Sequence, residues 1–127
     1  MPSVAAERPR YLNLFRIRLP VTGVVSLAHR VSGVVLFLAI PFGVWLLERS
    51  VSGEQNFAAT LALLQQPVIK LLTLLVLWSL AHHFFAGIRF LLIDVDIGVD
   101  KQASRNGAWL VLAAEALVVL ALLGWLL

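Results

Sequence analysis

The chain has 127 residues, enough for one domain and too few for two, and it contains no cysteine, which excludes disulfides and iron–sulfur ligation by this chain. Hydrophobic residues make up 61% of it and charged residues only 13%, which excludes a soluble globular protein. The net charge of +3 comes from scattered basic residues rather than a basic stripe, which excludes a nucleic-acid-binding surface. The composition therefore indicates an integral membrane protein in contact with lipid.

Three apolar segments predict an all-α bundle of three transmembrane helices, with residues 1–127 forming a single membrane-anchor domain. The spans are predicted at residues 21–47, 67–93 and 107–127. Pro41 lies inside the first span, where we expect it to loosen or kink the helix, as membrane helices tolerate. Within the polar connector that follows, residues 57–64 are predicted to form a short interfacial helix ending before Pro67. Residues 94–106 form a charged connector before the third span.

The basic residues predict how the chain is oriented in the membrane. Eight of the ten lie either in the N-terminal region through Arg30 or between Arg89 and Arg105. The other two, Arg49 and Lys70, flank the first connector. Because cytoplasmic loops carry the excess of Lys and Arg, we expect the N-terminus in the cytoplasm and the C-terminus on the opposite side. The first 20 residues do not have the features of a signal peptide.

Two histidines lie in the middle of the second span, where ionisable groups are expensive and therefore point to function. His82 and His83 point about 100° apart on a helix and cannot share a face. The face of His83 carries small residues, including Ala86 and Gly87, which leave room for a large flat group. A neutral imidazole with space around it is suited to axial ligation of haem iron. The alternative is a packing histidine bonded across helices.

The first span carries a polar stripe at helical spacing: Thr22, Ser26, His29, Arg30 and Gly33. Hydroxyl and guanidinium groups can hydrogen-bond the carbonyl oxygens of a quinone or the propionates of a haem. The alternative for Arg30 is that its side chain extends to the cytoplasmic headgroups. Because a single good axial ligand cannot complete a six-coordinate haem, the pattern favours a cofactor shared with a second membrane chain.

Three further charged residues lie in or near the spans. Arg89 and Asp94 are expected near the cytoplasmic end of the second span, at about the level of Arg30. Glu115 lies about two turns inside the third span, where it is either neutral, paired with a basic residue, or turned toward a partner subunit.

Two motifs in this order resemble the cytochrome b subunit of succinate dehydrogenase, the larger membrane anchor of bacterial complex II. The first is Ser26-x-x-His29-Arg30-x-Ser32, preceded by Arg8-Pro9, and the second is His83-x-x-x-Gly87-Ile88-Arg89-Phe90 followed by Asp94. Departures from the family pattern are Arg10, Ile93 and Asp96, the last of which replaces a small residue. By this resemblance the chain is a multi-pass protein of the bacterial cytoplasmic (inner) membrane.

The resemblance implies a role for each matching position. His83 would be the axial ligand of haem b, and His29 and Arg30 would lie near the haem propionates. Ser26 and Arg30 would bind ubiquinone. Asp94, Arg89 and His82 are second-shell or proton-path candidates, His82 at a position where the family does not require histidine. No residue of this chain is expected to be catalytic in succinate oxidation.

The resemblance also implies the partners and the reaction. A second membrane anchor would supply the opposite haem ligand, and iron–sulfur and flavoprotein subunits would oxidise succinate and pass electrons to ubiquinone. The chain would be a subunit of this enzyme and inactive alone. The alternatives are a purely structural membrane anchor without haem, and a fumarate reductase anchor that uses menaquinone.

Overall fold

The computed structural model describes residues 17–126, without the side chains of residues 125 and 126, and its regular elements are all α-helices. They are α1 (Val21–Val51), α2 (Glu54–Leu64), α3 (Pro67–Asp94) and α4 (Lys101–Leu126). Three of them, α1, α3 and α4, are long and apolar enough to cross a membrane. The predicted all-α membrane bundle of three spans is therefore confirmed. The Arg8-Pro9 and Arg10 positions, and the last residue of the predicted third span, lie outside the described residues.

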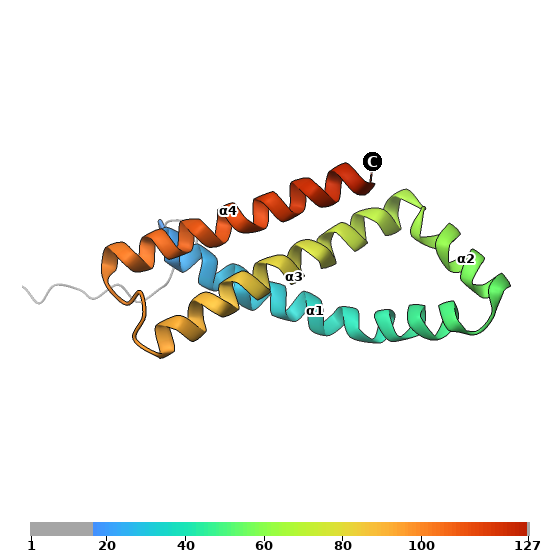
Figure 1. Cartoon of the computed structure of the whole chain (residues 1–127), viewed down its shortest axis with the longest axis horizontal. Coiled ribbons are helices and arrows are strands. Elements are labelled where there is room, and N and C mark those ends of the chain that lie inside the picture. The colour runs from blue at the N-terminus through green and yellow to red at the C-terminus, as the bar shows by residue number, and fades with distance from the viewer. Residues whose placement is uncertain (1–16, 127) are drawn as a thin grey trace, which may run out of the picture.

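The three long helices lie side by side, with α3 running antiparallel to α1 and α4 (Figure 1). The short helix α2 links the far ends of α1 and α3. All three long helices come together near the end of the bundle at which α1 begins, because Val25 of α1 packs there with Ala86 of α3 and Ala108 of α4. We refer to this as the α1-start end of the bundle.

The helix ends differ from the predicted span ends in two places. α1 continues to Val51, and α4 begins at Lys101 rather than at Gly107, so part of the predicted charged connector is helical. Hydropathy reports the lipid-facing length of a helix, whereas backbone hydrogen bonds continue into polar turns outside the lipid. The predicted short helix is confirmed as α2, which ends at Leu64 before Pro67 opens α3.

The turn after α3 has the hydrogen bonds of a Schellman motif. The N–H of Ile97 donates to the carbonyl of Leu92 at 2.9 Å, and the N–H of Asp96 donates to that of Ile93 at 3.0 Å. Asp96 has a φ of 61°, the left-handed conformation that this motif requires and that glycine adopts most readily. This is a physical reason for the small residue that the resemblance described above implies at the position of Asp96.

The core is small and built from small side chains. Val25, Ala86, Ala108 and Val111 are buried, and Val21, Phe85, Phe90 and Leu112 pack against them. Small residues at helix contacts let the backbones approach closely, which is how helices associate in lipid. Elsewhere large apolar side chains face outward, such as Phe37 at 72% and Leu110 at 70% exposure. Such a surface is stable only against lipid or another membrane chain.

Replacing Asp96 with glycine should stabilise the chain by up to about 1 kcal/mol, because glycine has no Cβ to oppose the left-handed backbone. Asp96→Val should destabilise it, since a branched side chain is the least tolerated there. Thermal unfolding in detergent, followed by circular dichroism, measures both changes. Asp100→Gly is the matched control, because Asp100 lies in the same connector without a positive φ. An equal gain from both glycine variants would contradict the explanation.

Candidate functional site

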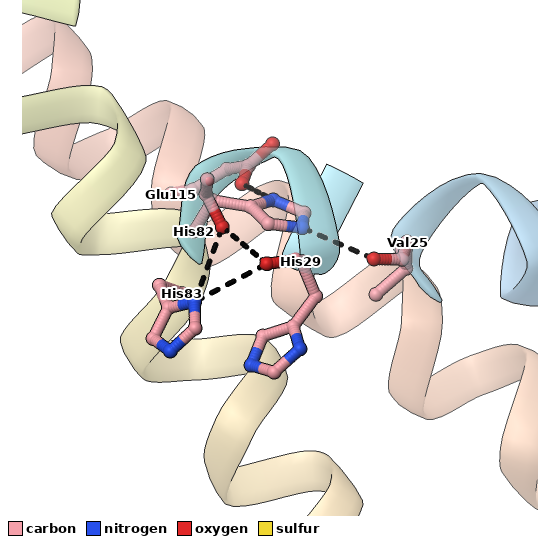
Figure 2. Close-up of polar contacts among 6 residues, drawn as sticks. Val25, His29, His82, His83 and Glu115 are labelled. Atoms are coloured by element: carbon pink, nitrogen blue, oxygen red, sulfur yellow. Dashed lines mark hydrogen bonds and ion pairs between the residues drawn. The ribbon is translucent and has the colours of Figure 1, made fainter. Parts of the chain in front are cut away.

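His82 is fully buried and joins α3 to both of its neighbours (Figure 2). Its Nδ1 pairs with Oε2 of Glu115 on α4, and its Nε2 lies 3.3 Å from the carbonyl oxygen of Val25 on α1. Both ring nitrogens are therefore engaged, which leaves His82 no free lone pair for a metal. Of the alternatives for Glu115, the structure selects pairing within this chain.

The partners of His82 also fix the charge of the pair. A carbonyl oxygen only accepts, so Nε2–H of His82 donates to Val25. One further proton then lies between Nδ1 and the Glu115 carboxyl. Whichever of the two atoms holds it, the pair carries no net charge. This neutrality is what allows a carboxyl group to lie inside a membrane-spanning helix.

The His83 side chain also points toward α1, and it contacts that helix one turn beyond the Val25 carbonyl. Its Nδ1 lies 3.2 Å from the carbonyl oxygen of His29 and 3.3 Å from Oγ of Ser32. Since the carbonyl only accepts, Nδ1 carries the proton and donates it. Ser32 in turn donates its hydroxyl hydrogen to the same carbonyl at 2.9 Å. In the neutral ring Nε2 then keeps its lone pair, and Figure 2 shows Nε2 directed away from these contacts.

The ring of His29 stacks on that of His83, with centroids 4.1 Å apart and planes within 10°. The His29 ring also contacts the Phe90 ring, with centroids 5.1 Å apart, and it lies close to Gly87. Gly33 of α1 gives the His83 ring its space, because a Cβ there would lie 3.2 Å from Cε1 of that ring. The room predicted from Ala86 is not found, because Ala86 is fully buried in the core.

Ser26 and Arg30 lie on α1 in the turns that carry His29, so the predicted polar stripe reaches the histidine pair. Ser26 is half-buried, and Arg30 is exposed. Within the described part of the chain neither side chain has a hydrogen bond or ion pair. Their donors are therefore unengaged among residues 17–126.

Arg89 and Asp94 lie apart from the histidines. Arg89 is buried on the α4 side of α3, where Nη2 donates to Oγ of Ser104 at 2.8 Å and to its carbonyl at 3.1 Å. Asp94 is exposed as the last residue of α3. Among the described residues, neither contacts His83.

Three residues that position the histidines were not given a role from the sequence: Ser32, Gly33 and Glu115. Ser32 is the last residue of the first motif and lies three residues after His29. A serine at this spacing can donate its hydroxyl to the earlier carbonyl of its own helix, as Ser32 does. Gly33 showed only as a small member of the polar stripe. The pairing of Glu115 with His82 crosses between helices and leaves no signal in the spacing of either.

A family model for the succinate dehydrogenase/fumarate reductase transmembrane subunit matches residues 5–122. The chain is 32% identical over 115 residues to the succinate dehydrogenase cytochrome b556 subunit of Coxiella burnetii, covering 90% of this chain and 92% of that protein. The subunits of the same name from Paracoccus denitrificans and Rickettsia felis are 27% and 28% identical, each match covering at least 90% of both proteins.

Gly33→Ala should destabilise the chain by about 1–2 kcal/mol, because the new Cβ meets a His83 ring that its Nδ1 bond holds in place. Gly43→Ala is the matched control on the same helix, since a Cβ there meets nothing within 4 Å. Thermal unfolding in detergent compares the two. Equal stability of both variants would show that the close approach of Gly33 to His83 has no consequence.

Proposed function

Because the chain belongs to the succinate dehydrogenase/fumarate reductase transmembrane subunit family, we propose that it is the anchor that binds haem b and ubiquinone in a succinate:quinone oxidoreductase. As a member of that family with three membrane-spanning helices, it is a multi-pass inner-membrane protein. The relatives named above are cytochrome b556 subunits, a name that implies haem b. The observation that carries the proposal is the pair of contacts that Nδ1 of His83 makes with α1, at the carbonyl of His29 and at Oγ of Ser32.

The donor set at His83 fits an axial haem ligand. A ligating imidazole needs one bare nitrogen, and its other nitrogen usually donates to a backbone carbonyl or carboxylate that fixes the ring. His83 has this arrangement, with Nδ1–H donating to the His29 carbonyl and Nε2 unengaged in the described part of the chain. Its neighbour His82 uses both nitrogens.

This chain supplies one axial ligand, so the second comes from a partner. The rings of His29 and His83 stack face to face, so their nitrogens do not converge on one point and this chain would hold haem through His83 alone. Within residues 17–126 no three His, Cys, Asp or Glu side chains are grouped to hold a metal ion. A second membrane anchor that contributes a histidine completes the site, and the apolar outer faces of the helices offer it a surface.

Ubiquinone binds beside the same pair of helices, at Ser26 and Arg30. The serine hydroxyl and the guanidinium both donate, and a quinone presents two carbonyl oxygens that accept. Negative charge develops on these oxygens as the quinone is reduced, so donors already in place stabilise the reduced form. The exposed Arg30 also suits a haem propionate, and His29 lies next to it in the chain.

The rest of the reaction belongs to other subunits. The basic α1-start end faces the cytoplasm, and there an iron–sulfur subunit and a flavoprotein dock and oxidise succinate. Haem b, when bound, supplies a one-electron carrier whose potential is set by its axial ligands and surroundings. This chain holds the quinone, orients His83 and keeps water out of the helix contacts. Alone, it does not oxidise succinate.

His83→Ala should abolish the low-spin haem b absorbance of the assembled complex, because the axial nitrogen is lost. His29→Phe should keep it, because His83 is oriented by the backbone carbonyl of residue 29, which this substitution leaves in place. Optical spectra of the purified complex, oxidised and then reduced with succinate, measure both. The reverse pattern would assign the ligand to His29, and a wild-type complex without haem b would favour a purely structural anchor.

Ser26→Ala and Arg30→Leu should each lower succinate–quinone turnover about 10-fold or more, which corresponds to one lost hydrogen bond to a charged group. The rate at which succinate reduces an artificial dye should stay unchanged, because the dye accepts electrons before they reach the quinone site. Ser50→Ala is a matched control on α1, because its hydroxyl donates to the carbonyl of Leu47 in the same helix and to nothing else among the described residues. Equal loss in both assays would indicate failed assembly rather than a quinone site.

A further inference from the structure

His82 and His83 bind α1 at two points one helical turn apart. Nε2 of His82 meets the carbonyl of Val25, and Nδ1 of His83 meets the carbonyl of His29. The two imidazoles leave α3 about 100° apart. Two such bonds to one neighbour fix both the rotation of α3 about its axis and its height against α1. If one of these bonds is removed, α3 can rotate against α1 about the bond that remains.

Glu115 determines which nitrogen of His82 faces α1. The carboxyl takes Nδ1, so Nε2–H is the atom left for the Val25 carbonyl. Without the carboxyl, a fully buried Nδ1 would have no hydrogen-bond partner, and turning the ring toward another partner would become favourable. The bond from His82 to α1 therefore depends on α4.

We propose that Glu115 and His82 are positioning residues that set the direction of the His83 imidazole, and hence its alignment as a haem ligand. This rests on the ligation proposed above for His83. Glu115 acts through His82, and neither residue touches the iron. The chain of contacts runs from the Glu115 carboxyl to the His82 ring, through the peptide bond that joins His82 to His83, and from the His83 ring to the His29 carbonyl on α1.

The test compares two substitutions at residue 115 in the intact complex. Glu115→Leu removes the partner of Nδ1, whereas Glu115→Gln keeps a hydrogen-bonding group of the same length. The electron paramagnetic resonance spectrum of oxidised low-spin haem depends on how its axial imidazole rings are oriented. We expect the leucine variant to shift this signal and the haem midpoint potential at unchanged haem content, and the glutamine variant to restore both.

Ser104→Ala is the control for a general loosening of α3 against α4. It removes the hydroxyl that Arg89 reaches, while the backbone contact of Arg89 to residue 104 remains. An unshifted signal in Glu115→Leu would overturn the proposal. So would the same shift in Ser104→Ala, because the effect would then not pass through His82.

A second measurement does not need haem. The chain has only three histidines, so [15N]histidine labelling of the full chain in lipid nanodiscs gives an assignable NMR spectrum. Wild type and Glu115→Gln should both show His83 protonated at Nδ1, and Glu115→Leu should lose this single state. Retention of it in the leucine variant contradicts the positioning role. A complex without haem would contradict the proposed function, while the NMR result would still decide the role of Glu115.

Discussion

The structure depends on hydrogen bonds from two side chains of α3 to backbone carbonyls of α1. In lipid a polar side chain has no water to turn to, so it must find a partner within the protein. His82 and His83 do so by using carbonyls that already serve the helix of α1, and Ser32 adds its hydroxyl to one of them. The same bonds that hold the helices together therefore decide which imidazole nitrogen is left bare.

The burial of the two neighbouring histidines separates their roles. His82 lies among three helices with both nitrogens taken, whereas His83 is half-buried at the edge of the α1–α3 contact. A buried, fully bonded imidazole adds rigidity, and a partly exposed one with a lone pair can ligate. Rigidity next to His83 would serve the ligation proposed for it, because a ligating ring has to keep its direction.

Much of the architecture could be predicted from the sequence, because long apolar segments bounded by charges leave little choice of fold. The preference for His83 over His82 came from facial spacing, and it stays a prediction. In the structure both ring nitrogens of His82 have partners, whereas Nε2 of His83 has none among the described residues. The pairing of His82 with Glu115 was beyond sequence reasoning, because helices that are apolar on all sides carry no signal of which way they are turned. The His29 carbonyl was equally invisible, since every residue has one. The helix α4 begins at Lys101, before the span predicted from residue 107, because polar residues such as Lys101 and Arg105 can extend a helix beyond its apolar part.

The position of Glu115 on the last helix has a consequence for biosynthesis. Ribosomes deliver α1 and α3 to the membrane before α4, and only residues 95–100 separate α3 from α4. The carboxyl of Glu115 thus enters the bilayer beside an imidazole that has already arrived. The Glu115 carboxyl would oppose insertion of α4 as an isolated segment. Paired with His82, it instead favours the packing of α4 against α3.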